Sequence, residues 1–148
     1  MHYQNPRIVA GTLPVSGSRV LLCRRAIAPR KGFWTLPAGF MENAETTVEA
    51  AARETLEEAC AEVRIHGLYT LINLPHIEVY AMFRADLMGG FDTGSESLEV
   101  ALFETGENSP STIERTLRHF FQDRRDGGYP LHISDITSED RERYFGSA

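Results

Sequence analysis

Cysteine is scarce in this chain, and no long apolar segment is present. The two cysteines, Cys23 and Cys60, lie 37 residues apart, so the sequence has no CxxC pair and no cluster with zinc-ligand spacing. No apolar run approaches the ~20 residues that span a bilayer, and the N-terminus lacks the basic and apolar regions of a secretory signal. We therefore expect a cytoplasmic protein without a membrane partner, in which both thiols are buried and reduced rather than joined in a disulfide.

Positive charge is also in short supply. Lys and Arg total 15 against 21 Asp and Glu, which gives a net charge of −6. Broad binding to a nucleic-acid backbone requires cationic side chains that neutralise phosphates, so nucleic acid is not an expected partner. A chain of 148 residues with 42% apolar and 24% charged residues is typical of one globular domain. We expect a single domain over residues 1–148, with residues 1–6 as a lead-in and residues 138–148 as a charged tail.

Hydrophobic patterning predicts several strands interleaved with two helices. Two apolar, β-branched runs flank the turn residues Ser16-Gly17-Ser18 and predict a hairpin. A second hairpin is predicted around the break at Leu74-Pro75-His76. This order of elements indicates an α/β (α+β) fold. The predicted strands cover residues 7–15, 19–24, 33–36, 63–74, 77–87 and 98–103.

Both helices carry boundary signals. The first is predicted over residues 46–62, with Thr46 as N-cap and Glu49 three residues later, as in a capping box. The second begins at Pro110-Ser111 and ends at Asp126-Gly127-Gly128. Its apolar residues at i, i+4, i+7 and i+8 predict a stripe that faces the core. These residues are Ile113, Leu117, Phe120 and Phe121.

Three carboxylates of the first helix share one face. Glu54, Glu57 and Glu58 stand at i, i+3 and i+4, so neighbouring Cβ atoms lie about 5–6 Å apart. On a solvated face each like-charge pair costs only about 0.2–0.5 kcal/mol, which is one interpretation. In a cleft of effective dielectric ~20 each pair costs roughly 3 kcal/mol, and a divalent cation would then be needed. Arg53 lies four residues from both Glu49 and Glu57 and is spaced to bridge them.

The spacing upstream of this helix favours the metal interpretation. Gly39 is followed six residues later by Glu45, and Glu45 eight residues later by Arg53-Glu54, then Glu57-Glu58. This pattern resembles the Nudix box, the signature of the Nudix hydrolase family, and a chance match is on the order of 10⁻⁵. The sequence around it is similar to a subgroup that acts on dinucleotides, as FAD, NADH and ADP-ribose pyrophosphatases do. Thr55 and Cys60 depart from the motif, which has an apolar residue and a glycine at these positions.

The resemblance implies a fold, a reaction and a set of site residues. It implies an α/β/α sandwich with a mixed sheet, and hydrolysis of a nucleoside diphosphate linked to another moiety, with Mg²⁺ or Mn²⁺ as cofactor. The three helix glutamates would be metal ligands, together with a backbone carbonyl near Ala38-Gly39. Arg53 would orient the glutamates, and Glu45 would be structural. Many relatives in the subgroup carry an N-terminal zinc ribbon, which this sequence lacks, and many are homodimers.

The general base is open between a box glutamate and a carboxylate from a distant loop. Glu96 and Glu99 are the loop candidates, and the alternative for Glu96 is a solvated loop residue. If Leu98 and Val100 face the core, Glu99 points to the other face, while Glu96 lies at the loop end of the strand. We therefore favour Glu96.

Other residues have both a binding and a structural interpretation. Trp34 can stack on a base or belong to the core, and His76 can contact substrate or be solvated in its loop. Arg24 and Arg25 belong to a basic cluster with Arg30 and Lys31, which can meet phosphates or balance the acidic helix. The alternative function is a Nudix-fold nucleotide-binding module or sensor with weak catalysis. Its usual sign would be missing box carboxylates, and none is missing.

Overall fold

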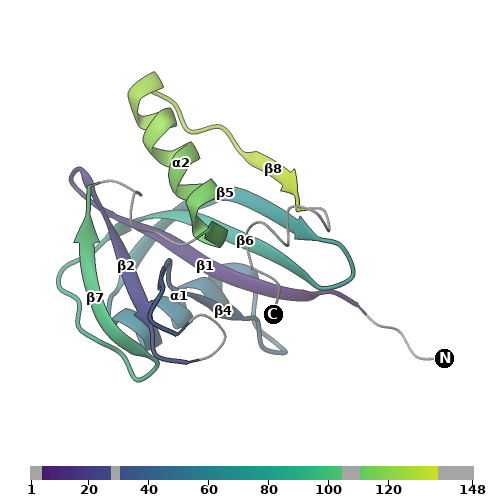
Figure 1. Cartoon of the computed structure of the whole chain (residues 1–148), viewed down its shortest axis with the longest axis horizontal. Coiled ribbons are helices and arrows are strands. Elements are labelled where there is room, and N and C mark those ends of the chain that lie inside the picture. Colours follow the sequence, from purple (N-terminus) through teal and green to yellow (C-terminus); the bar gives the residue numbers. More distant parts are fainter. Residues whose placement is uncertain (1–4, 28–30, 105–110, 137–148) are drawn as a thin grey trace.

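One mixed β-sheet lies between two helices (Figure 1). The computed structural model describes residues 5–27, 31–104 and 111–136, with side chains of the second helix described from Arg115 onward. Within these ranges no helix is long and apolar enough to cross a membrane. The strands are β1 (Arg7–Ser16), β2 (Arg19–Arg25), β3 (Trp34–Thr35), β4 (Ala38–Phe40), β5 (Val63–Leu74), β6 (Glu78–Leu87), β7 (Ser97–Phe103) and β8 (His132–Asp135), and the helices are α1 (Thr47–Ala59) and α2 (Ser111–Asp126).

Strand β1 is central and changes partner along its length. On one side it runs parallel to β6 from Arg7 to Val15. On the other side its first half pairs with β4 and its last residues pair with β2. The path of hydrogen-bonded strands is β3-β2-β1-β6-β5-β8, with β4 beside β1 and β7 beside β2. β4 and β2 therefore lie on the same side of β1, one after the other along its length.

Both predicted hairpins are confirmed, and two short strands were missed. β1 and β2 are antiparallel, as are β5 and β6. β4 was not predicted, because a three-residue segment after a proline carries no periodicity. β8 was not predicted either. It has only four residues, and its extended conformation depends on parallel pairing with β5, which is distant in the sequence. The predicted charged tail at 138–148, residues 1–4 and Arg30 lie outside the described residues.

The two faces of the sheet bury side chains of different size. Beneath α2, large residues such as Leu13, Tyr69 and Met82 pack with Leu117 and Phe120 of the helix. Beneath α1 the cluster is built mainly from alanines, with Ala10 and Ala81 of the sheet against Ala50 and Ala51 of the helix. Small side chains let a helix approach a sheet closely. The acidic helix is therefore held tightly against the sheet and β4.

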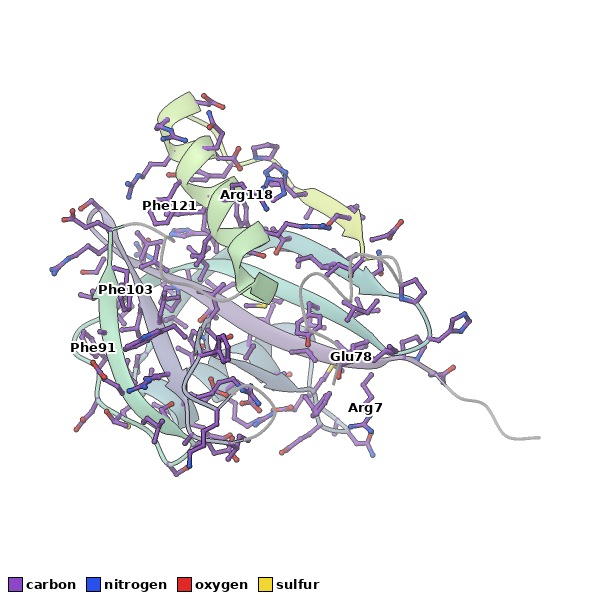
Figure 2. The ribbon with its side chains drawn as sticks, viewed as in Figure 1. Arg7, Glu78, Phe91, Phe103, Arg118 and Phe121 are labelled. Atoms are coloured by element: carbon purple, nitrogen blue, oxygen red, sulfur yellow. The ribbon has the colours of Figure 1, made fainter. Side chains whose placement is uncertain are left out.

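The predicted apolar stripe of α2 is confirmed at its described positions. Leu117 and Phe120 are buried, and Phe121 packs at the margin of the same cluster. Phe103 of β7 reaches that margin too, and Figure 2 shows both rings on the flank where β7 and α2 approach each other. The side chain of Ile113 lies outside the described residues. α2 thus belongs to the same core as the sheet.

Helix α1 begins as the sequence predicts and ends sooner. The Thr46 hydroxyl accepts a hydrogen bond from the Glu49 N–H at 3.1 Å, and the Glu49 carboxylate accepts one from the Thr46 N–H at 3.1 Å. Thr55 is fully buried: its hydroxyl donates to the Ala51 carbonyl and lies 2.6 Å from the Thr12 hydroxyl. These bonds satisfy a polar group at a position where the motif has an apolar residue.

The prediction of two buried thiols is correct for Cys23 and wrong for Cys60. Both cysteines are free, but Cys60 is exposed because it forms the C-cap of α1 at the surface. It adopts the left-handed conformation, with φ 49° and ψ 36°, and its N–H donates to the Leu56 carbonyl. The cap geometry that the motif achieves with glycine is therefore kept here with a residue that has a Cβ atom.

Replacement of Cys60 by glycine is expected to stabilise the protein. A side chain in the left-handed region costs about 1 kcal/mol, which glycine avoids. Cys60→Gly should raise the melting temperature by about 2–4 °C in a thermal unfolding experiment. Cys60→Ala is the matched control, since it removes the thiol and keeps the Cβ atom. An equal rise in both variants would contradict the explanation.

Candidate active site

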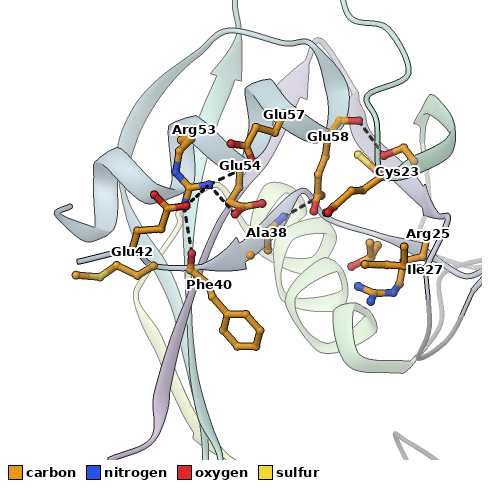
Figure 3. A pocket seen from close by; sticks show the side chains of 15 residues that line it. Cys23, Arg25, Ile27, Ala38, Phe40, Glu42, Arg53, Glu54, Glu57 and Glu58 are labelled. Carbon is orange, nitrogen blue, oxygen red and sulfur yellow. Dashed lines mark hydrogen bonds and ion pairs between the residues drawn. The ribbon is translucent and has the colours of Figure 1, made fainter. Parts of the chain in front are cut away.

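A cleft of about 460 Å³ lies between α1, β4 and the residues at the start of β7 (Figure 3). Glu54, Glu57 and Glu58 reach it from one face of α1, as their spacing predicts, and Glu96 reaches it from the segment before β7. The structure therefore brings the predicted carboxylates together with the backbone of β4. The full lining consists of Cys23, Arg25, Ile27, Thr35, Ala38, Gly39, Phe40, Met41, Glu42, Arg53, Glu54, Glu57, Glu58, Glu96 and Ser97.

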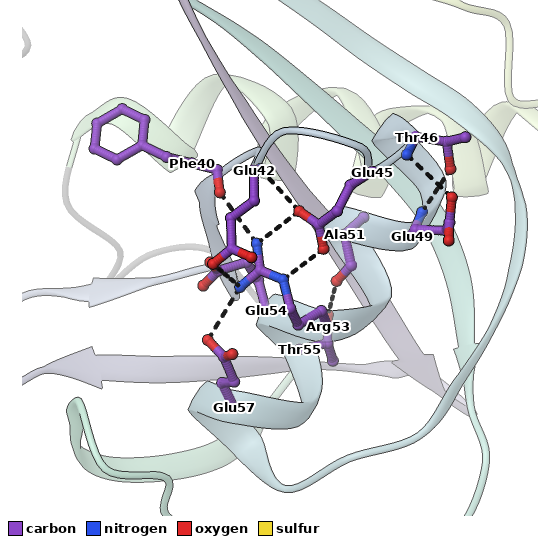
Figure 4. A network of polar contacts seen from close by, with 10 residues as sticks. All are labelled: Phe40, Glu42, Glu45, Thr46, Glu49, Ala51, Arg53, Glu54, Thr55 and Glu57. Carbon is purple, nitrogen blue, oxygen red and sulfur yellow. Dashed lines mark hydrogen bonds and ion pairs between the residues drawn. The ribbon is translucent and has the colours of Figure 1, made fainter.

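Arg53 holds the acidic groups in place through a forked set of bonds (Figure 4). Its Nε and Nη2 atoms donate to both oxygens of Glu45, at 2.6 and 3.0 Å. Nη1 donates to Glu54 at 2.9 Å and to Glu57 at 3.2 Å, and Nη2 also donates to the Phe40 carbonyl at 3.1 Å. The bonds to Glu45, followed by those to Glu54 and Glu57, hold the pKa of Arg53 well above its usual range. The guanidinium links α1 to the loop before it.

One predicted partner of Arg53 is wrong. The helical spacing favoured Glu49, but the Glu49 carboxylate is bound to the backbone of Thr46 in the capping box. Glu45 takes its place from the loop, where its Oε1 atom also accepts from the Glu42 N–H at 2.8 Å. Arg53 therefore connects the loop to the helix. Helical spacing relates residues of one helix only, so it does not predict this contact with the loop.

Burial and mutual repulsion disfavour the charged forms of the cleft carboxylates. Burial, reinforced by Glu54, raises the pKa of Glu58 to about 8, although the Ala38 N–H donates to Glu58 at 3.2 Å. Burial also raises the pKa of Glu54, against the lowering effect of Arg53. Glu96 contributes to both shifts through its negative charge. A bound cation would stabilise the ionised form of each group.

β4 approaches α1 so closely that its central position has no room for a side chain. A Cβ atom built on Gly39 would lie 2.2 Å from the carboxyl carbon of Glu54 and 2.3 and 2.4 Å from its oxygens. Glycine is thus needed at position 39 because a larger residue would overlap the Glu54 carboxylate. This contact places the backbone at Ala38 and Gly39 beside the acidic groups, as the resemblance implies.

A β-bulge lies at the start of β7, close to the two loop carboxylates. Along the β2–β7 pair, Arg24 lies opposite Glu99 but Arg25 lies opposite Ser97, so Leu98 is an extra residue. Leu98 is 47% exposed rather than core-facing, and Glu99 is exposed beside it. Bulges redirect neighbouring side chains. Glu96 lines the cleft, whereas Glu99, which pairs with Arg24, does not.

Of the predicted substrate contacts, the structure brings only Arg25 to the cleft. Arg24 is exposed and its Nε donates to the Gly32 carbonyl at 3.0 Å. Trp34 packs against the core cluster, with its ring 4.9 Å from that of Phe103 in an edge-to-face arrangement. His76 is exposed in the β5–β6 turn, where it adopts a left-handed φ of 68°.

Several lining residues were not predicted. Phe40 follows Gly39 directly and is 46% exposed, and Ile27 is 47% exposed. The position of Phe40 directly after the motif glycine could have indicated from the sequence that it lies near the cleft. Cys23, Thr35 and Ser97 come from strands, and only the pairing of β2 with β3 and β7 brings them to the cleft.

The donor set suits a hard divalent cation that keeps part of its water shell. Every side chain of α1 and the β7 lead-in that could bind an ion here offers carboxylate oxygens. Among the described residues, however, no group of three or more His, Cys, Asp or Glu side chains is placed so that it could hold a metal ion by itself. Mg²⁺ is typically held by one or two carboxylates plus water and substrate phosphates rather than by a full protein cage. An open row of glutamates fits that mode of binding.

The stretch of chain that builds this cleft also matches a known family. The family model described as NUDIX domain matches residues 5–110. The chain belongs to the Nudix hydrolase family. The match contains the motif from Gly39 to Glu58 and extends through β7.

Three relatives illustrate the extent of the similarity. A Nudix hydrolase structure from Nitrosomonas europaea is 49% identical, with a TM-score of 0.87 over 91% of this chain and 81% of that chain. An ADP-ribose pyrophosphatase from Methanocaldococcus jannaschii is 28% identical over 109 residues, so that 69% of this chain spans 64% of the relative's length. A bifunctional NMN adenylyltransferase/ADP ribose pyrophosphatase from Francisella tularensis, complexed with AMP and a Mn ion, is 16% identical, with a TM-score of 0.62 over 85% of this chain and 43% of that chain. The Nudix-type α/β/α sandwich predicted from the resemblance is confirmed.

Proposed function

We propose that this Nudix chain is a pyrophosphohydrolase, dependent on Mg²⁺ or Mn²⁺, that cleaves the diphosphate of an ADP–X compound. ADP-ribose, FAD and NADH are the candidate substrates, and water attack on phosphorus would yield AMP and a phosphorylated X. The observation that carries the proposal is the row of Glu54, Glu57, Glu58 and Glu96 along one cleft. The names of two relatives support ADP-ribose as the first compound to test.

The metal would be held by the glutamates of α1 and the backbone of β4. Glu54, Glu57 and Glu58 would supply carboxylate oxygens, and a carbonyl at Ala38 or Gly39 would complete the protein ligands. When bound, the cation neutralises the diphosphate and lowers the pKa of a water molecule. Arg53 keeps Glu54 and Glu57 in place and does not take part in the chemistry.

Glu96 would act as general base. It lies outside α1 yet lines the same cleft, so it can accept a proton from a water held near the α1 glutamates. A neutral amide at this position cannot accept that proton.

The other side of the cleft offers groups that suit a nucleotide. Arg25 lines it and favours the charged form of Glu58 through its own positive charge, and a guanidinium can also meet a phosphate. Phe40 exposes an aromatic ring that can stack on a base, with the Arg7 guanidinium 4.9 Å from the ring centroid. These side chains, rather than the glutamates, would bind the base and phosphates of the nucleotide.

Hydrolysis of a substrate panel tests the proposal. ADP-ribose, FAD, NADH, a diadenosine polyphosphate and nucleoside triphosphates would each be incubated with Mg²⁺ or Mn²⁺, and AMP release would be measured. Metal-dependent cleavage of one ADP–X compound would support the proposal and name the substrate. Binding of a compound without cleavage, detected by a thermal shift, would favour the sensor alternative instead.

The identity of the base is tested by a matched pair of variants. Glu96→Gln is expected to lower kcat about 10²–10⁴-fold, because general base catalysis typically contributes that factor. Glu99→Gln, two positions beyond the start of β7 and exposed, should leave kcat unchanged. The opposite result would assign the proton transfer to Glu99.

Crowding at Gly39 is expected to disturb the metal site without unfolding the protein. In Gly39→Ala the new methyl group collides with the far end of the Glu54 side chain, which can rotate away. We expect kcat to fall about ten- to hundredfold, with a melting temperature close to that of the wild type. Gly90→Ala is the control, since a Cβ atom there meets nothing within 4 Å. A Gly39→Ala variant with full activity would show that the position of Glu54 is not critical.

Domain organisation, cellular location and oligomeric state are also part of the proposed function. We infer one Nudix domain over residues 1–148, supported by the packing of α2 onto the sheet that carries the cleft. We also propose a cytoplasmic location, and a homodimer follows from the resemblance alone. Light scattering coupled to gel filtration would measure the mass of the assembly, and a monomer would remove that part of the proposal.

A further inference from the structure

The segment before β7 is fastened to the C-terminal end of α1. The Asp92 N–H donates to the Ala59 carbonyl at 2.8 Å, and the Gly94 N–H donates to the Glu58 carbonyl at 3.0 Å. The Ser97 hydroxyl donates to that same Glu58 carbonyl at 2.8 Å. The last carbonyls of a helix have no partner within the helix. Here two of them, the carbonyls of Glu58 and Ala59, are satisfied by the segment that carries Glu96.

Gly94 and Ser97 are the two ends of a tight turn, and Glu96 lies within it. The Ser97 N–H donates to the Gly94 carbonyl at 3.2 Å, which closes the turn. The Glu96 carbonyl also accepts from the Ala26 N–H at 3.1 Å. Glu96 is therefore fixed at its own backbone and at both ends of its turn, and both ends bind the backbone of Glu58.

Gly94 leaves no space for any larger residue. A Cβ atom at this position would lie 1.9 Å from the Glu57 carbonyl oxygen and 2.7 Å from the carbonyl carbon and oxygen of Glu58. These are backbone atoms within a helix, so they cannot rotate away as a side chain can. The close approach of the turn to α1 thus depends on glycine.

We propose that Gly94 and Ser97 are positioning residues, which anchor the turn that carries Glu96 to the carbonyl of Glu58 and so set Glu96 relative to the α1 glutamates. The proposal rests on the function proposed above, because it assigns Glu96 a role in hydrolysis. It explains how a carboxylate from a loop keeps a defined place beside three carboxylates from a rigid helix.

The test is Gly94→Ala, with Gly90→Ala as the matched control. Gly94→Ala should lift the turn from α1 and lower kcat about ten- to hundredfold, the usual cost of losing support for an active-site group. KM should stay within about twofold, since no substrate contact is assigned to Gly94. Ser97→Ala removes one anchor without adding atoms, and a smaller loss of kcat is expected. It provides the test if Gly94→Ala fails to fold.

A double-mutant cycle distinguishes positioning from general damage. In a Glu96→Gln background, Gly94→Ala should lower kcat by less than about threefold, because the group it positions is already disabled. An equal loss in both backgrounds would overturn the proposal, as would a kcat of Gly94→Ala equal to that of Gly90→Ala.

Amide hydrogen exchange tests the anchoring without any assay of activity. Gly94→Ala should increase exchange at residues 92–97 and leave residues 47–55 of α1 protected, whereas Gly90→Ala should change neither segment. Equal protection of 92–97 in both variants would overturn the proposal. If the wild type cleaves no compound of the panel, the proposed function fails, and the exchange comparison still decides whether the turn is anchored through Gly94.

Discussion

Replacement of Glu58 by glutamine is expected to reduce hydrolysis at least about 100-fold while the protein stays folded. Changes to groups that only support a metal ligand already cost 10- to 100-fold, so loss of a ligand should cost at least as much. Glutamine has the same shape and can still accept the hydrogen bond from the Ala38 N–H. It cannot supply a negative charge to a cation. The measurement is kcat on the compound that the panel identifies, with saturating Mg²⁺.

The physical reason lies in the position of Glu58 beside Glu54 and the backbone of β4. Burial and the neighbouring Glu54 together raise its pKa to about 8, so a bound cation would stabilise its charged form. Wild-type protein should be stabilised by millimolar Mn²⁺ in thermal unfolding, and Glu58→Gln should lose much of that shift. Glu62→Gln, on an exposed residue just beyond α1, is the control. Full activity in Glu58→Gln would refute the ligand assignment.

Loss of Asp123 is expected to destabilise the protein by about 2–4 kcal/mol and to leave kcat unchanged. Asp123 of α2 is buried and accepts hydrogen bonds from the Tyr69 hydroxyl and from Nε2 of His132, the latter at 2.7 Å. Asp123→Ala leaves both donors without this partner, and a buried polar group without a partner is costly. For a chain of this size the melting temperature should fall by about 5–10 °C.

This network joins α2, β5 and β8 on the face of the sheet opposite α1 (Figure 1). The His132 ring also stacks on His119, with centroids 3.8 Å apart. Asp126→Ala is the control, because Asp126 is exposed on the same helix and its carboxylate accepts hydrogen bonds from the Gln122 side chain at 3.2 Å. A fall in kcat without a fall in stability would show that the two faces are coupled in function.

The network should also depend on pH in a defined direction. Burial acts to raise the pKa of Asp123, but the hydrogen bonds from Tyr69 and His132 outweigh it and hold this pKa below its usual value. A lowered carboxyl pKa stabilises the fold above the ordinary value of about 4, and this contribution is lost as pH falls through the lowered pKa. The difference in melting temperature between wild type and Asp123→Ala should therefore shrink as pH falls below about 4.

The sequence by itself determined the features that depend on local geometry. Helical spacing places Glu54, Glu57 and Glu58 on one face whatever surrounds them, and the Thr46 capping box follows from residues three apart. Two hairpins were readable because their strands are neighbours in the chain. The Gly39 position was readable from the motif, and its reason, the contact with Glu54, is steric.

Only the tertiary structure decided the features that join distant segments. Arg53 binds Glu45 rather than Glu49, because the capping box already engages Glu49 and the loop folds back over the helix. The extra residue Leu98 shifts the register of β7, so that Ser97 rather than Leu98 lies opposite Arg25 beside the cleft. Such choices depend on strand pairing across many residues, where one added residue reverses which side chain faces the site.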